Sequence, residues 1–104
     1  KEEIAAWKKE HSVDELIAIK IEVSKGDWAY AYFKPLTALK NLRAVYSKVI
    51  KLLKADNTID AGEFVMKSTF VGGDNRVYDE KVLLKSSQLI LENIDVAEGE
   101  AERV

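Results

Sequence analysis

The stretch that decides the fold is LIAIKIEVSKGDWAYAYFK, which occupies residues 16–34. β-Branched residues alternate with polar or small ones over 16–23, and aromatic residues alternate with small ones over 28–33. A period of two is typical of a strand whose two faces differ. Between the two runs, residues 24–27 (SKGD) have the composition of a turn. The stretch therefore predicts an antiparallel β-hairpin.

A turn of two or four residues gives this hairpin the same register, because both lengths keep the same residues opposite one another. β-Branched and aromatic side chains then share one face, which is a favourable cross-strand pairing. The predicted pairs are Val23 with Trp28, Ile21 with Tyr30, and Ile19 with Tyr32. The other face, which we expect to be the more exposed, carries Ala18, Lys20, Glu22, Ala29, Ala31 and Phe33.

The edges of this hairpin are a candidate interaction surface. Two strands alone form a marginal sheet that needs helices to cover it. Open strand edges are a known route by which a partner or a second copy adds a strand. Lys20 and Lys34 could instead protect the edges against such pairing, and both interpretations stay open.

Outward from the hairpin, the pattern predicts helices. Within residues 1–11 the acids Glu2 and Glu3 lie near the start and Lys8 and Lys9 near the end, which suits the helix dipole, and Trp7 is expected to anchor this helix. Pro35 ends the second strand and can begin a helix. The expected elements are helices over 1–11, 36–54, 59–71 and 79–94, followed by an acidic tail over 95–104.

Side-chain chemistry suggests where these helices begin and end. Asp60 and Asp79 are expected to cap the third and fourth helices. Gly72 and Gly73 are expected to end the third, because glycine tolerates the left-handed conformation at a helix C-terminus. The sequence thus predicts an α+β fold, one antiparallel β-hairpin packed against three to four α-helices, in a single domain over 1–104.

The predicted helix over 36–54 is amphipathic and has no acidic residue. Its basic face could bind an acidic partner or nucleic acid, or could simply face water. That face carries Lys40, Arg43, Lys48, Lys51 and Lys54.

Composition limits the functions that fit. The chain has 104 residues, 47% of them hydrophobic and 33% charged, with a net charge of −2. An acidic balance argues against general nucleic-acid binding. The chain has no cysteine, which excludes disulfides and thiolate chemistry. No apolar run reaches the roughly 18 residues of a membrane span, so we expect a cytoplasmic protein.

Catalytic and metal-binding patterns are weak. His11 is the single histidine and has no partner placed by sequence. Residues 56–64 resemble half of an EF-hand calcium loop, but Lys54 stands where a ligand should be. We therefore expect no enzymatic activity, no cofactor and no metal site.

The order of elements resembles that of a known family. The features are Trp7-Lys8 in a first helix, Phe33-Lys34-Pro35 at the end of a hairpin, and the motif Phe-x-Gly-Gly-Asp over 70–74 before a terminal apolar helix. Over roughly residues 2–96 the chain is similar to small phage and prophage proteins of the tail assembly chaperone type. The resemblance implies a non-enzymatic factor in a bacterial host that binds a tape-measure or tail-tube protein.

The family resemblance implies no particular binding residues. Those we expect come from the hairpin face and the basic helix, namely Lys20, Glu22, Phe33, Lys34, Lys40, Arg43 and Lys51. Two other functions stay open: a structural subunit of a phage particle that self-associates, through the hairpin edges for example, and a binder of acidic partners or nucleic acid through the basic helix.

Overall fold

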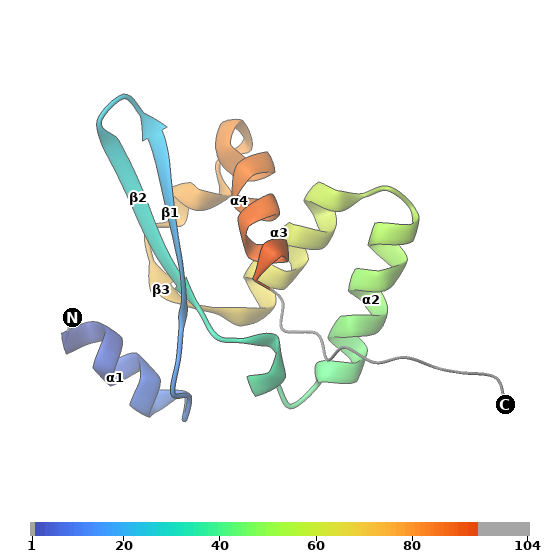
Figure 1. The fold of residues 1–104 in the computed structure, drawn as a ribbon, viewed down its shortest axis with the longest axis horizontal. Helices are drawn as coiled ribbons and strands as arrows, with labels where there is room; N and C mark the ends of the chain where they lie inside the picture. The colour runs from blue at the N-terminus through green and yellow to red at the C-terminus, as the bar shows by residue number, and fades with distance from the viewer. Residues whose placement is uncertain (1, 94–104) are drawn as a thin grey trace, which may run out of the picture.

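The computed structural model describes residues 2–93, and the acidic tail predicted over 95–104 lies outside them. The α+β fold class is confirmed: a three-stranded antiparallel sheet lies beside four α-helices (Figure 1). The elements are α1 (Glu2–Glu10), β1 (Ile17–Ser24), β2 (Asp27–Phe33), the 3-10 helix η1 (Leu36–Ala38), α2 (Leu42–Lys54), α3 (Thr58–Thr69), β3 (Phe70–Gly73), the 3-10 helix η2 (Asn75–Tyr78) and α4 (Glu80–Glu92).

The hairpin forms where it was predicted, but its register is shifted by one residue. Glu22 faces Trp28 and Lys20 faces Tyr30, and the pairing slips between Glu22 and Ser24. Lys25 and Gly26, the latter with a φ of +79°, form a two-residue turn closed by the pair of Ser24 with Asp27, and the slip is a bulge at Val23. The bulge adds one residue to β1, so beyond it every residue of β2 lies on the opposite face from the one that an unbulged two-residue turn gives.

The corrected register reverses the predicted faces of β2. Ala29, Ala31 and Phe33, expected on the exposed face, are each 0% exposed. Trp28 and Tyr30, expected on the apolar face, are 43% and 45% exposed. The inner face of the sheet is therefore formed by aliphatic residues of β1 together with two alanines and one phenylalanine of β2.

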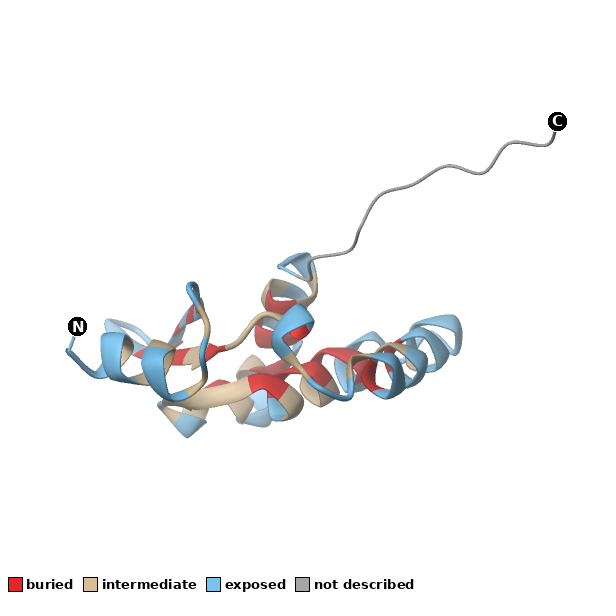
Figure 2. Cartoon of the chain, turned by 90° about the horizontal axis from the view of Figure 1, so that it is seen from below, coloured by how far each residue is buried: buried red, intermediate tan, exposed pale blue. Residues whose placement is uncertain are grey.

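The core lies between this inner face and the helices, as the buried residues in Figure 2 show. Helix α4 packs against β1 and α3, and α3 packs against α2 (Figure 1). The fully buried Phe33 contacts Phe70 edge-on, with ring centroids 5.7 Å apart. The buried aliphatic members of the core are Ile19, Ile21, Val23, Leu36, Val45, Val49, Val65, Val77, Leu83 and Ile90.

The predicted stop at Gly72-Gly73 is wrong, because α3 ends at Thr69 and the glycines belong to a third strand. β3 pairs with β2, so that Gly73 faces Ala31 and Gly72 faces Tyr32. Glycine is needed here for space: a Cβ on Gly72 would lie 2.5 Å from the ring of Trp7. The strand consequently closes one edge of the hairpin and leaves β1 at the edge of the sheet.

The predicted helix over 36–54 is divided into η1 and α2, with residues 39–41 between them. Asp56, two residues after the end of α2, has a φ of +59°. The N–H of Asn57 donates to the carbonyl of Leu52 at 2.8 Å. This is the Schellman arrangement, with aspartate in the position that glycine usually takes. Asp60 lies inside α3, which begins at Thr58, so its predicted capping role is wrong.

Asp79 does precede α4, but its side chain accepts no capping hydrogen bond. The backbone carbonyl of Asp79 instead accepts from the N–H groups of Val82 and Leu83, at 2.9 and 2.8 Å. The predicted position is confirmed and the predicted side-chain role is wrong.

Small residues let α3 and α4 approach closely. A Cβ built on Gly62 would lie 2.4 Å from the Cβ of Ser87, far inside van der Waals contact. The hydroxyl of Ser87 donates to the carbonyl of Ile59 at 3.1 Å, and that of Ser86 donates to the carbonyl of Val77 at 2.7 Å. The two buried serines are thus hydrogen-bonded, and α4 is held close to both α3 and η2.

Helix α1 lies on the outer face of the sheet, at one end of the hairpin (Figure 1). The ring of Trp7 contacts that of Tyr32, with centroids 5.4 Å apart, and also lies over Gly72. Trp7 therefore anchors α1 to the sheet, as the sequence predicted. The outer face is covered at this end, while Trp28 and Tyr30 stay exposed toward the turn.

Candidate functional site

The outer face of the hairpin carries an aromatic row next to a lysine. Alternation along β2 places Trp28, Tyr30 and Tyr32 on this face, and the register brings Lys20 of β1 opposite Tyr30. The Nζ of Lys20 lies 4.7 Å from the ring centroid of Trp28 and 5.7 Å from that of Tyr30, which are cation–π distances. The aromatic rings together with the amine of Lys20 form a partly apolar surface with one basic side chain, which is a candidate for contact with another molecule.

Glu22 shares this face and is fixed by the turn. Its Oε2 atom accepts a hydrogen bond of 2.9 Å from the N–H of Gly26. Lys20 and Glu22 were both predicted as binding residues, and the structure brings them together on one strand. Phe33 was predicted with them, but it is buried in the core and has no exposed surface to offer.

A groove of about 400 Å³ runs between β1 and α4. One wall comes from residues 20–22 of β1 together with Trp28, and the other wall from α4. Lys81 and Lys85 are exposed on the helix wall, while Val82 and Leu89 form its half-buried floor. The groove thus combines an apolar floor, an edge strand and three lysines, counting Lys20.

Sequence reasoning missed Lys81 and Lys85. On the predicted helix they are two charges among apolar residues, with no local pattern that marks a site. Their importance comes from the packing of α4 beside β1, which brings segments about sixty residues apart to one groove.

Arg76 connects the hairpin turn to η2 next to this groove. Its guanidinium donates to Asp27 at 2.7 Å and to Asp74 at 2.8 Å. Hydrogen bonds from Arg76 hold the pKa of both carboxyl groups below the usual value, and the two carboxylates raise the pKa of Arg76. The guanidinium of Arg76 is thus paired with both carboxylates, and the cluster holds the hairpin turn against η2.

The basic residues of α2, and Lys40 just before it, are separate from the groove. Lys40, Arg43 and Lys51 are exposed, and within residues 2–93 none of them forms an ion pair. Lys48 lies over the ring of Phe64, with its Nζ 4.5 Å from the centroid. Lys34, the remaining predicted residue, is half-buried where β2 ends, and its N–H donates to the carbonyl of Thr69 at 2.8 Å. The predicted site residues therefore fall into two distant groups, with Lys34 between them.

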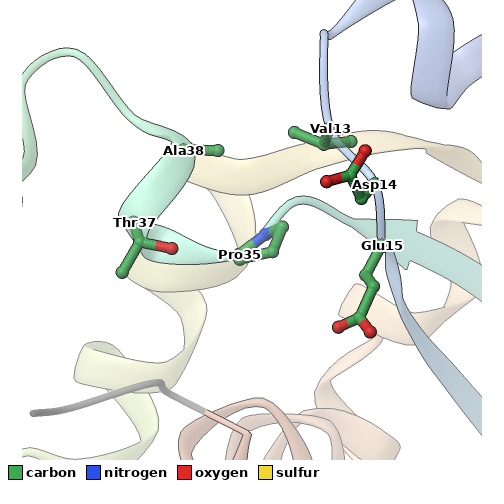
Figure 3. A pocket seen from close by; sticks show the side chains of 6 residues that line it. All are labelled: Val13, Asp14, Glu15, Pro35, Thr37 and Ala38. Carbon is green, nitrogen blue, oxygen red and sulfur yellow. The ribbon is translucent and has the colours of Figure 1, made fainter.

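Another hollow, of about 360 Å³, lies where the chain enters β1 and leaves β2 (Figure 3). It contains two carboxylates, those of Asp14 and Glu15, which point in different directions (Figure 3). Within residues 2–93 no three His, Asp or Glu side chains are placed to hold a metal ion.

His11 lies at the end of α1, 3.3 Å from the carboxylate of Glu10. Residues 56–64, which resemble part of a calcium loop, form the connection to α3 and its first two turns. Within the described part of the chain, no helix combines the length and apolar character that a membrane span requires.

No protein-family model, curated protein or solved structure matches this chain. The functional argument therefore depends on the surfaces described above.

Proposed function

We propose that the protein is a non-enzymatic protein-binding factor that takes up an extended segment of a partner along the edge of β1. The observation that carries this proposal is the position of β1 in the sheet. Among the strands of residues 2–93 it is the longest, with eight residues, and within that range it is hydrogen-bonded to β2 alone. An edge strand of this length presents a row of backbone N–H and carbonyl groups that another strand can pair with.

Two features next to the edge support the proposal. The groove against α4 provides a surface on which side chains of an added strand can pack. The exposed aromatic rings of Trp28 and Tyr30 extend the contact area on the outer face. Both features lie at the turn end of the hairpin, where α1 leaves the sheet uncovered.

The resemblance to phage tail assembly chaperones gives this function a class of partner. A tape-measure or tail-tube protein would then be the client, and pairing with β1 would protect a segment that otherwise aggregates. Unpaired strand edges promote aggregation, so a small α+β protein that pairs with an exposed strand of its client would protect the client.

Site-specific photo-crosslinking in the native host tests the proposal. Ala18 is exposed in β1 and Ala44 is exposed in α2, so each can be replaced by a photoreactive phenylalanine analogue. We expect a crosslink from position 18 to a defined peptide of another protein, and none from position 44. A crosslink from position 44 alone, or from neither position, would refute the proposal and favour the alternative in which Lys20 and Lys34 protect the edges of the hairpin.

Self-association is the second candidate, because one surface favours it. Ile59 of α3 and Leu84 of α4, 40% and 52% exposed, line a common hollow of about 560 Å³ rimmed by Asp56, Asp60 and Glu80. Exposed aliphatic residues that share a surface are common at interfaces between proteins. Sedimentation of the wild-type chain and a Leu84→Glu variant distinguishes the candidates, because a dimer that the variant abolishes would favour a structural subunit.

A further inference from the structure

We infer that the groove between β1 and α4 selects an acidic extended segment whose apolar side chains face α4. This inference rests on the proposed function, since it assumes that the segment pairs with the edge of β1. It adds to that function the chemical class of the partner, which neither the fold nor the edge strand specifies.

The charges around the groove are unequal. Lys20, Lys81 and Lys85 line it together with a single acid, Glu22. Within residues 2–93 none of the three lysines has a carboxylate oxygen within 4.0 Å of its Nζ. Glu22 already accepts a hydrogen bond from the N–H of Gly26. Because the whole chain has a net charge of −2, this excess of positive charge is a local feature and not a general property of the surface.

The lysines occupy both walls of the groove. Lys20 lies on the sheet wall, where its Nζ stays within cation–π distance of Trp28. Lys81 and Lys85 lie four residues apart on α4, which places them on the same side of the helix, one turn apart. A strand that pairs with β1 would run between these walls, so its acids, which point away from the apolar floor, would lie nearest Lys20, while Lys81 and Lys85 add to the positive potential of the groove.

The floor of the groove explains why the segment must also carry apolar residues. Val82 and Leu89 are seven residues apart on α4 and are both half-buried, so they share the face that borders the groove. Side chains of an added strand alternate between its two faces, and those on the inner face would cover these two residues. Burial of that apolar surface contributes affinity, while the acidic side chains contribute selectivity.

The experiment uses a labelled peptide as long as β1, with the sequence Asp-Val-Glu-Thr-Asp-Val-Glu-Thr. Its matched counterparts replace every acid by the corresponding amide, or by lysine. Binding is measured by fluorescence anisotropy, and backbone pairing by hydrogen exchange of the amides in β1. Exposed ion pairs contribute modestly, so three lysines predict about tenfold tighter binding of the acidic peptide than of its amide counterpart.

Two charge-reversal variants test the location. Lys85→Glu should weaken binding of the acidic peptide about fivefold or more. Lys51→Glu, which makes the same change on the exposed face of α2, should leave binding unchanged. Equal weakening by both variants would overturn the inference, because it would show general attraction to the protein's charge.

The outcomes separate the inference from the function on which it rests. Equal binding of the acidic and amide peptides, with protection of β1 amides, would support strand addition and overturn acidic selection. Tighter binding of the lysine peptide would also overturn it. Absence of protection in β1 with every peptide would overturn both the inference and strand addition at this edge.

Discussion

Replacement of Gly62 by alanine tests how the position of α4 is set. The added Cβ would lie 2.4 Å from the Cβ and 2.6 Å from the Cα of Ser87. Carbon atoms pack at about 3.5–4.0 Å, so α4 must move away from α3 by more than about 1 Å. Overpacking of this kind costs about 1–3 kcal/mol, and a clash with backbone belongs at the upper end. Alanine recovers about 1 kcal/mol in helix propensity. The expected net loss in unfolding free energy is about 2 kcal/mol.

Substitution of Ser87, the residue that faces Gly62, gives a second test of this close approach. Ser87→Gly alone removes the hydrogen bond from Ser87 to Ile59, about 1 kcal/mol, and places glycine in a helix, about 1 kcal/mol more. In the Gly62→Ala background it also removes the contacts with the Cβ and Oγ of Ser87, while the contact with the Cα of that residue remains. The double variant should therefore lose less stability than the sum of the two single variants, with a coupling energy of about 1–2 kcal/mol.

Urea unfolding followed by far-UV circular dichroism measures all four proteins of this cycle. The dependence of the unfolding free energy on urea concentration should be the same in all four proteins, because the surface exposed on unfolding changes little. A Gly62→Ala variant as stable as the parent, or a double variant whose losses simply add, would refute the role of this close approach.

Three further predictions follow from the other local structures. Asp56→Gly should stabilise the protein by about 0.5–1 kcal/mol in urea unfolding, because glycine accepts the positive φ at the end of α2 without strain; a neutral or destabilising result contradicts the Schellman assignment. Hydrogen bonds from Arg76 lower the pKa values of Asp27 and Asp74 in the folded protein. The two ionised carboxylates therefore stabilise the fold above their unfolded pKa, near 3.8, and this contribution is lost as pH falls through the folded pKa values. The urea midpoint of the parent should thus fall more on acidification than that of Arg76→Gln. Burial, assisted by Glu63, raises the pKa of Tyr78 to about 12, so its ionisation destabilises the fold as pH rises from 10 toward 12; ultraviolet titration should show one late tyrosine that Tyr78→Phe removes.

The strands and most helices could be predicted because their signals are local. Alternation from Ile17 to Val23 requires one face of β1 to be buried, whatever the rest of the chain does. The register of β2 could not be obtained in this way, because it depends on the bulge at Val23, where the alternation of residue types is uninterrupted. Gly26 marks the left-handed position of the turn but gives no sign of the bulge before it.

The third strand was missed because its sequence has two interpretations. Two glycines after a helical pattern are usual at a helix C-terminus, and residues 70–73 are too few for a clear alternation. Tertiary contacts decide between them: Phe70 pairs with Phe33, and the ring of Trp7 fills the space over Gly72. The candidate groove was missed for the same physical reason, because Lys81 and Lys85 become site residues only through the packing of α4 on β1.

The register also explains why the candidate binding surface is aromatic. Ala29 and Ala31 make the inner face of β2 shallow, which allows α4 and η2 to lie close to the sheet. The larger side chains Trp28 and Tyr30 are consequently displaced to the outer face, where more than two-fifths of each is exposed to solvent. Burying them would have contributed more to stability than exposing them does. A surface that keeps large aromatic rings in water, beside an open strand edge and unpaired lysines, is better suited to binding than to folding.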